Sequence, residues 1–149
     1  MTAATIVRWN GLRIIGHETF RGTPREVGTV RGWVRKLLAD HVGGDALDTV
    51  ELLVSELVTN AVVHSDSRDD VLQVCVAVGR DAAMGGDVVH VEVIDRGSTV
   101  NVPRMRSADD LDLGGRGLDL VHRLADAWSS EHSPTRGVVW FQVGCSLTS

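Results

Sequence analysis

In the stretch Glu56-Leu57-Val58-Thr59-Asn60-Ala61-Val62-Val63-His64, the longest helical pattern of a 149-residue sequence comes to its end. The pattern opens at Asp45 and Asp48 and predicts one long helix. On a wheel at about 100° per residue, its apolar positions share one broad arc and its polar positions share the other side. The arc holds Val50, Leu53, Val54, Leu57, Val58 and Ala61, and the polar side holds Asp48, Glu51, Ser55, Glu56, Thr59 and Asn60.

Glu56 and Asn60 are four residues apart, so their side chains lie one above the other on the polar side of this helix. A carboxylate and an amide in this arrangement suit a hydrated Mg²⁺, with the amide oxygen bound directly and the carboxylate through water. The carboxylate also suits a general base. A solvated polar helix face accounts for the same pair, and the two residues alone leave both interpretations open.

On the N-terminal side of this helix, residues 12–20 predict a strand, because they mix β-branched and polar residues. Thr23, Pro24 and Glu26 match a capping box with proline at the first helical position, so a helix is predicted to begin there. Its apolar residues recur at helical spacing and should face a sheet: Val27, Val30, Val34, Leu37 and Leu38. The glycines at 43 and 44 end the pattern.

Two valine-rich runs, 71–78 and 88–94, follow the long helix and predict adjacent strands. The second run alternates apolar and polar residues, which predicts one buried face: Val89, Val91 and Val93 against His90 and Glu92.

Asp95 stands where the second of these strands gives way to a loop, with Gly97 two residues on. A carboxylate at such a place can accept a hydrogen bond from the amino group of a base, although a turn-forming aspartate explains it as well. No periodicity survives from Asp95 to Leu113, and so long an irregular stretch in a compact domain is typical of a functional lid.

The run Gly114-Gly115-Arg116-Gly117 leads into a third helical pattern, with Leu118, Val121, Leu124, Ala125 and Trp128 on one side. Backbone N–H groups and the positive end of a helix dipole make such a turn a natural phosphate cradle, and a plain loop is the alternative. A Rossmann fingerprint would need glycine where the chain has Leu120, and no Gly-Lys-Ser/Thr of a P-loop is present. Two strands, near 127–131 and over 138–143, complete the chain.

The order of these elements predicts an α+β sandwich of two layers, with helices on one face of a mixed, mostly antiparallel sheet. The length, with 43% hydrophobic and 23% charged residues, is that of one globular domain over residues 1–149. The formal net charge is −5 and the 15 lysines and arginines are scattered, which argues against nucleic acid as a partner.

Cys75 and Cys145 each lie in an apolar run expected to be strand, which favours buried free thiols and a reducing cytoplasm. No uninterrupted apolar stretch approaches the ~18 residues needed to span a bilayer, and the first ten residues do not look like a signal peptide. We therefore expect a cytoplasmic chain without a membrane segment.

Taken in order, Glu-x-x-x-Asn, Asp-x-Gly and Gly-Gly-x-Gly-Leu form a set. The stretch 56–64 resembles the N box of the GHKL superfamily, 95–97 its first glycine box, and 114–118 its second. The chain is most similar to the stand-alone anti-sigma-factor serine kinases and related single-domain ATP-binding regulators of actinobacteria. The resemblance runs from the first helix to the strand at 139–141 and implies the Bergerat, or histidine kinase-like ATPase, fold.

This resemblance implies ATP and Mg²⁺ as cofactors and a role for each motif residue. Glu56 would polarise water or the attacking hydroxyl, Asn60 would ligate Mg²⁺, and Asp95 would bind the adenine amino group. The nucleotide would also be lined by Gly97, Gly114, Gly115, Arg116, Gly117 and Leu118. Residues 98–113 would form the ATP lid, which in such domains closes over the triphosphate.

Three positions depart from the family's pattern. Val63 replaces a basic residue often found three places after the asparagine, Ser98 stands where the first glycine box has its second glycine, and Val138 stands for a late-strand threonine. These departures predict fewer phosphate and adenine contacts. His64, at the helix end, is expected to pack and hydrogen-bond rather than to catalyse.

Two functions remain open from the resemblance. One is a serine/threonine protein kinase that phosphorylates an anti-sigma antagonist and, when free, sequesters a sigma factor. The other is a non-catalytic ATP-binding module that sequesters a transcription regulator. A histidine kinase is disfavoured, because no phosphoacceptor helix pair or sensor segment is expected and His64 lies on the ATP-binding helix itself. The partner, the turnover and a possible homodimer stay undecided.

Overall fold

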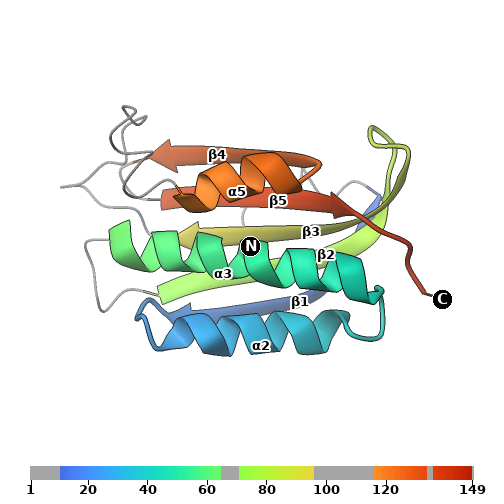
Figure 1. Cartoon of the computed structure of the whole chain (residues 1–149). Helices are drawn as coiled ribbons and strands as arrows, with labels where there is room; N and C mark the ends of the chain where they lie inside the picture. Colours follow the sequence, from blue (N-terminus) through green and yellow to red (C-terminus); the bar gives the residue numbers. More distant parts are fainter. Residues whose placement is uncertain (1–10, 65–70, 96–115, 134–135, 149) are drawn as a thin grey trace.

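Two layers make up the described part of the chain, a five-stranded sheet and three helices that cover one of its faces (Figure 1). The computed structural model describes residues 11–64, 71–95, 116–133 and 136–148. The strands are β1 (Leu12–Arg21), β2 (Val71–Asp81), β3 (Gly86–Asp95), β4 (Ala127–Ser133) and β5 (Arg136–Gly144), and the helices are α2 (Glu26–Leu38), α3 (Gly44–His64) and α5 (Arg116–Leu124). The expected element order and the α+β two-layer class are confirmed.

The strand order is β1-β2-β3-β5-β4, and every neighbouring pair of described strands is antiparallel. A short turn joins β2 to β3, where the Asp81 carboxylate accepts the backbone N–H groups of Ala83 and Met84 at 2.8 and 3.2 Å. Because β3 and β5 are antiparallel neighbours, the end of β3 pairs with the start of β5, and Asp95 lies opposite Gly137. This register brings Asp95, the first residue of the predicted motif 95–97, beside a glycine of a distant strand.

The start of α2 differs from the expected capping box. Helix α2 begins at Glu26, with Arg25 as the capping residue and no side-chain capping bond. The backbone carbonyls of Thr23 and Pro24 accept the N–H groups of Glu26 and Val27 at 2.9 and 3.2 Å. Because a backbone turn already satisfies these first N–H groups, the Thr23 side chain has no capping role and Pro24 precedes the helix.

The core lies between the two layers, as the helical and strand periodicities predicted. On α3 the positions of the expected arc are buried, with Ala61 half-buried at its end. Helix α2 contributes Val30, Val34 and Leu38, and the central strands contribute valines with Phe141 of β5. Each such buried side chain stabilises the fold by about 1.5–3 kcal/mol, before entropy is counted. In the described ranges no helix is long and apolar enough to cross a membrane.

The expectation of one buried face on β3 is wrong. Its residues from Val88 to Ile94 are all buried, and both His90 and Glu92 lie on the sheet face opposite to the helices with at most 1% of their surface exposed. Alternation of apolar and polar residues indicates that the two faces of a strand differ, but it does not indicate that the polar face is exposed to water.

The third helix is shorter than its apolar pattern suggested. Helix α5 ends at Leu124, and Trp128 belongs to β4, where its indole N–H donates to His122 Nδ1 at 3.3 Å. Leu124 was expected on the packed side of the helix but is 42% exposed. The predicted helical pattern therefore ran past the end of α5 and into β4.

Candidate nucleotide site

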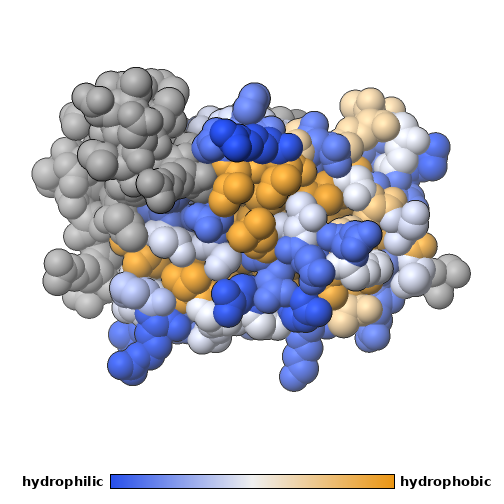
Figure 2. Space-filling model, viewed as in Figure 1, coloured by the Kyte–Doolittle hydropathy of each residue, from blue (hydrophilic) through white to orange (hydrophobic). Residues whose placement is uncertain are grey.

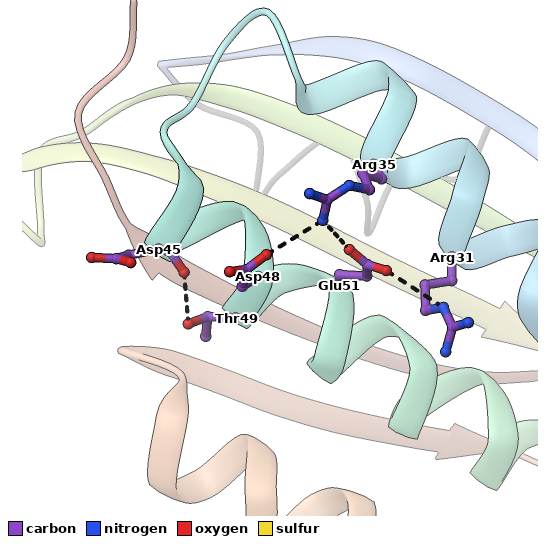
Figure 3. A network of polar contacts seen from close by, with 6 residues as sticks. All are labelled: Arg31, Arg35, Asp45, Asp48, Thr49 and Glu51. Carbon is purple, nitrogen blue, oxygen red and sulfur yellow. Dashed lines mark hydrogen bonds and ion pairs between the residues drawn. The ribbon is translucent and has the colours of Figure 1, made fainter.

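Helix α3 carries two polar flanks with different surroundings. On one flank, the carboxylate of Glu51 contacts Arg31 and Arg35 of α2, and Arg35 also reaches Asp48 at 3.4 Å (Figure 3). Glu51, with Asp48 next, raises the pKa of the Arg35 guanidinium. Exposed ion pairs add little stability, so α3 packs on α2 mainly through the buried apolar side chains.

The second flank carries Glu56 and Asn60, which lie about 140° and about 180° round the helix from Glu51 at about 100° per residue. Both side chains are half-buried and lie one helical turn apart, as predicted. Neither makes a side-chain hydrogen bond or ion pair with another described residue. In contrast, the hydroxyl of neighbouring Thr59 donates to the Ser55 carbonyl at 2.7 Å. An acid and an amide without such partners, in a half-buried place, are available to a ligand.

Asp95 ends β3 and is half-buried. Side chains alternate along a strand, and Val91 and Val93 pack into the core under the helices. Asp95 therefore lies on the helix face of the sheet, the face that α3 covers. Its cross-strand neighbour is Gly137, so no side chain from this position of β5 lies beside the carboxylate.

The register of β5 shows which face carries Val138, the residue expected in place of a late-strand threonine. Val138 pairs with Ile94, and both face away from the helices, whereas Val139 packs against the core under them. Gly137 and Val139 are the nearest β5 residues that share the face of Asp95. Val138 therefore lies on the sheet face opposite to Asp95, because neighbouring side chains of a strand point to opposite faces.

Helix α5 begins at Arg116, with Gly117 and Leu118 in its first turn. Its N-terminal N–H groups and dipole favour an anion such as phosphate. The remaining predicted residues lie outside the described part of the structure: Gly97, Ser98, Gly114, Gly115 and the lid at 98–113. The side chains of Val63, His64, Arg116 and Leu118 are outside it as well.

The end of α3, the end of β3 and the starts of α5 and β5 all lie at one end of the sandwich (Figure 1). This end combines a strand-end carboxylate, a carboxylate above an amide, and a helix N-terminus. These groups suit a purine amino group, a hydrated Mg²⁺ and phosphate, in that order. The described residues hold no cluster of three or more metal-binding side chains. Mg²⁺ needs none, because it keeps waters and substrate phosphates as ligands.

A buried polar cluster on the far face of the sheet was missed by the sequence analysis. His90 Nε2 lies 3.0 Å from Glu92 Oε2, and Gln142 Nε2 lies 2.9 Å from His90 Nδ1. Trp140 stacks on the His90 ring, with centroids 5.1 Å apart. The adjacent polar residues of β3 were the available signal, but alternation alone assigned them to solvent. The cluster lies on the sheet face opposite to the helices and joins β3 to β5.

Comparisons with known proteins agree with this fold. The sequence model of the family described as "Histidine kinase-like ATPase domain" matches residues 20–143. Among solved structures, the chain is similar to the RsbU and RsbW domains of Rv1364c from Mycobacterium tuberculosis, with a TM-score of 0.61 and 22% identity. That match covers 90% of this chain but only 32% of the other, so it concerns the fold alone. Among curated proteins no sequence matches.

Proposed function

Because the chain belongs to the histidine kinase-like ATPase domain family, we propose that it binds ATP with Mg²⁺ at the end of the sandwich that carries Glu56, Asn60 and Asp95. One observation carries the proposal: Glu56 and Asn60 are half-buried and have no side-chain partner among the described residues. In contrast, the hydroxyl of Thr59, on the same helical turn, bonds within the helix. The carboxylate and the amide are therefore available to a ligand such as a hydrated Mg²⁺.

Each residue has a role that follows from its chemistry. The Asp95 carboxylate accepts a hydrogen bond from the adenine amino group, a charge-assisted bond that selects adenine over guanine. The Asn60 amide oxygen is a hard ligand for Mg²⁺, which neutralises phosphate charge when it is bound. Glu56 accepts a proton from the attacking water or hydroxyl. The N-terminus of α5 faces the phosphates, and the segment 98–113 serves as the lid.

We assign the chain to phosphotransfer regulation, as a serine/threonine kinase that passes the γ-phosphate of ATP to a regulatory protein in the cytoplasm. The motifs resemble those of anti-sigma-factor kinases, and the fold is similar to a structure that contains an RsbW domain. A sigma factor or an anti-sigma antagonist is the corresponding partner. The second candidate is a non-catalytic module that sequesters a transcription regulator. It is favoured by the valines at 138 and 139, because neither offers a hydroxyl for a contact with the nucleotide from the last strand.

Thermal unfolding with and without ATP and Mg²⁺ tests the binding step. A ligand that binds only the native state stabilises it by about 2.7 kcal/mol at a hundred times its Kd. We expect ATP to raise the midpoint more in the presence of Mg²⁺ than with a chelator, and GTP to raise it less. Absence of any nucleotide shift, in a chain that unfolds cooperatively, contradicts the proposed site.

Transfer of labelled γ-phosphate separates the kinase from the non-catalytic module. The chain is mixed with candidate regulatory proteins, and the labelled residue is identified by mass spectrometry. The kinase proposal predicts phosphoserine or phosphothreonine on the partner and loss of the label with Glu56→Gln. Binding of Mg·ATP without hydrolysis or transfer to a partner that forms a complex supports the module instead.

A further inference from the structure

The end of the sandwich opposite to the proposed nucleotide site contains a cavity of about 500 Å³ that is wide open to solvent. It lies between the first turns of α3, the last residue of α5 and the chain that leaves β5 (Figure 1). The lining residues are Gly43, Gly44, Asp45, Ala46, Thr49, Leu124, Val143, Gly144, Cys145 and Ser146. Its volume falls in the range of small-ligand and side-chain pockets, roughly 300–1,000 Å³.

Hydrogen bonds hold the floor of this cavity in place. The Gly144 N–H donates to Asp126 Oδ2 at 2.6 Å, and the Leu147 N–H donates to Asp87 Oδ2 at 3.3 Å. The hydroxyl of Thr148 donates to the Asp40 carbonyl at 2.8 Å, so the chain after β5 is tied to the segment before α3. These hydrogen bonds hold the residues around the cavity in place, which lowers the entropy cost of filling it.

The walls combine apolar surface with negative charge. Leu124 is 42% exposed, while Val143 and Ala46 form the apolar wall behind it. Apolar surface gathers over α5 and toward α3, bordered by hydrophilic residues (Figure 2). No lysine, arginine or histidine is among the lining residues.

The charge at the rim comes from Asp45. Its carboxylate points away from Arg31 and Arg35, and no described cation contacts it (Figure 3). The full negative charge of the Asp45 carboxylate outweighs the positive helix dipole at the N-terminus of α3, which is equivalent to roughly half a charge. Asp87 and Asp126, which hold the floor, add to the negative potential.

We propose that this cavity docks an arginine side chain of a partner protein, with an apolar residue beside it in the partner. The aliphatic stem would pack on Leu124 and Val143, and the guanidinium would pair with Asp45. Arginine fits better than lysine, because its planar head is weakly hydrated and binds a carboxylate through two hydrogen bonds. An anionic ligand such as nucleotide or phosphate is excluded by the same carboxylates. The proposal is independent of ATP binding at the other end.

NMR titration of the full chain with small probes tests the proposal. The probe is N-acetyl-leucyl-arginine amide, and N-acetyl-leucyl-glutamate amide is its charge-reversed control. We expect saturable shifts of the amide signals of Asp45, Thr49 and Leu124 with the arginine probe, and none with the glutamate probe. Equal response to both probes, shifts spread over the whole surface, or no saturable shift at these residues overturns the proposal.

Two matched pairs of variants identify the groups that bind. Asp45→Asn should weaken the arginine probe about two- to fivefold, the range for an exposed ion pair, whereas Asp48→Asn should not change it. Leu124→Ala should weaken it by a similar factor through lost apolar contact, whereas Leu52→Ala, also 42% exposed, should not. Equal effects within either pair contradict the site. None of the four changes should alter ATP affinity, so failure here is distinguishable from failure of the nucleotide proposal.

Discussion

Alkaline pH should destabilise the fold through one buried thiol, Cys75. This residue is 4% exposed, and burial, followed by the negative charge of Glu92 opposite to it on β3, raises the pKa of its thiol from 9.0 to about 11. Burial also raises the pKa of half-buried Cys145 to about 11, with Asp87 second. Both cysteines are free thiols.

The sign follows from which state ionises first. In the unfolded chain the thiol ionises near pH 9, while the folded chain keeps it protonated up to about pH 11. The stability contribution is therefore fully present below pH 9 and is lost as the pH rises from 9 to 11. A difference of two pKa units corresponds to about 2.7 kcal/mol, of which about 1.4 is lost at pH 10. Cys145 should contribute less, because solvent screens a half-buried group.

The composition makes this pH range unusually easy to interpret. The sequence has no tyrosine, and Lys36 is its one lysine, so few other side chains ionise between pH 9 and 11. Urea unfolding followed by tryptophan fluorescence, at pH 8, 9, 10 and 11 with a reducing agent, measures the loss. Lys36→Arg is the control and should keep it, whereas Cys75→Ala should remove most of it. If Cys75→Ala loses as much stability as the parent over this range, the reasoning is refuted.

Three further predictions concern the site and the fold. Asp95→Asn should weaken ATP by about 1–3 kcal/mol in titration calorimetry with little change in unfolding, and unchanged affinity would remove Asp95 from the site. Asn60→Ala should abolish the Mg²⁺-dependent part of ATP affinity. Glu56→Gln should keep ATP binding and lower turnover about 10²–10⁴-fold. An equal loss of ATP binding in both variants would contradict their separate roles. Gly79→Ala should cost about 1–3 kcal/mol in urea unfolding, because its Cβ would lie 2.7 Å from a main-chain oxygen of the adjoining segment. Gly32→Ala, where a Cβ meets open space, should instead stabilise by up to about 1 kcal/mol, and similar effects at both positions would exclude the steric cause.

Sequence by itself determined the features that depend on one element at a time. The spacing of valines and leucines specified α3 and its buried arc, because a helix repeats every 3.6 residues whatever surrounds it. The same geometry placed Glu56 and Asn60 one turn apart. The position of Asp95 at a strand end was likewise local, since an apolar run stops there.

Tertiary structure alone decided what lies against each face. The pairing of Asp95 with Gly137, the turn of Val138 away from the helices and the burial of His90 and Glu92 all depend on β5 lying beside β3. The cavity at Asp45 likewise needs α3, α5 and the chain after β5 to meet. Periodicity shows that an element has two unlike faces, but contacts between residues far apart in the chain determine what covers each one, and no local pattern encodes them.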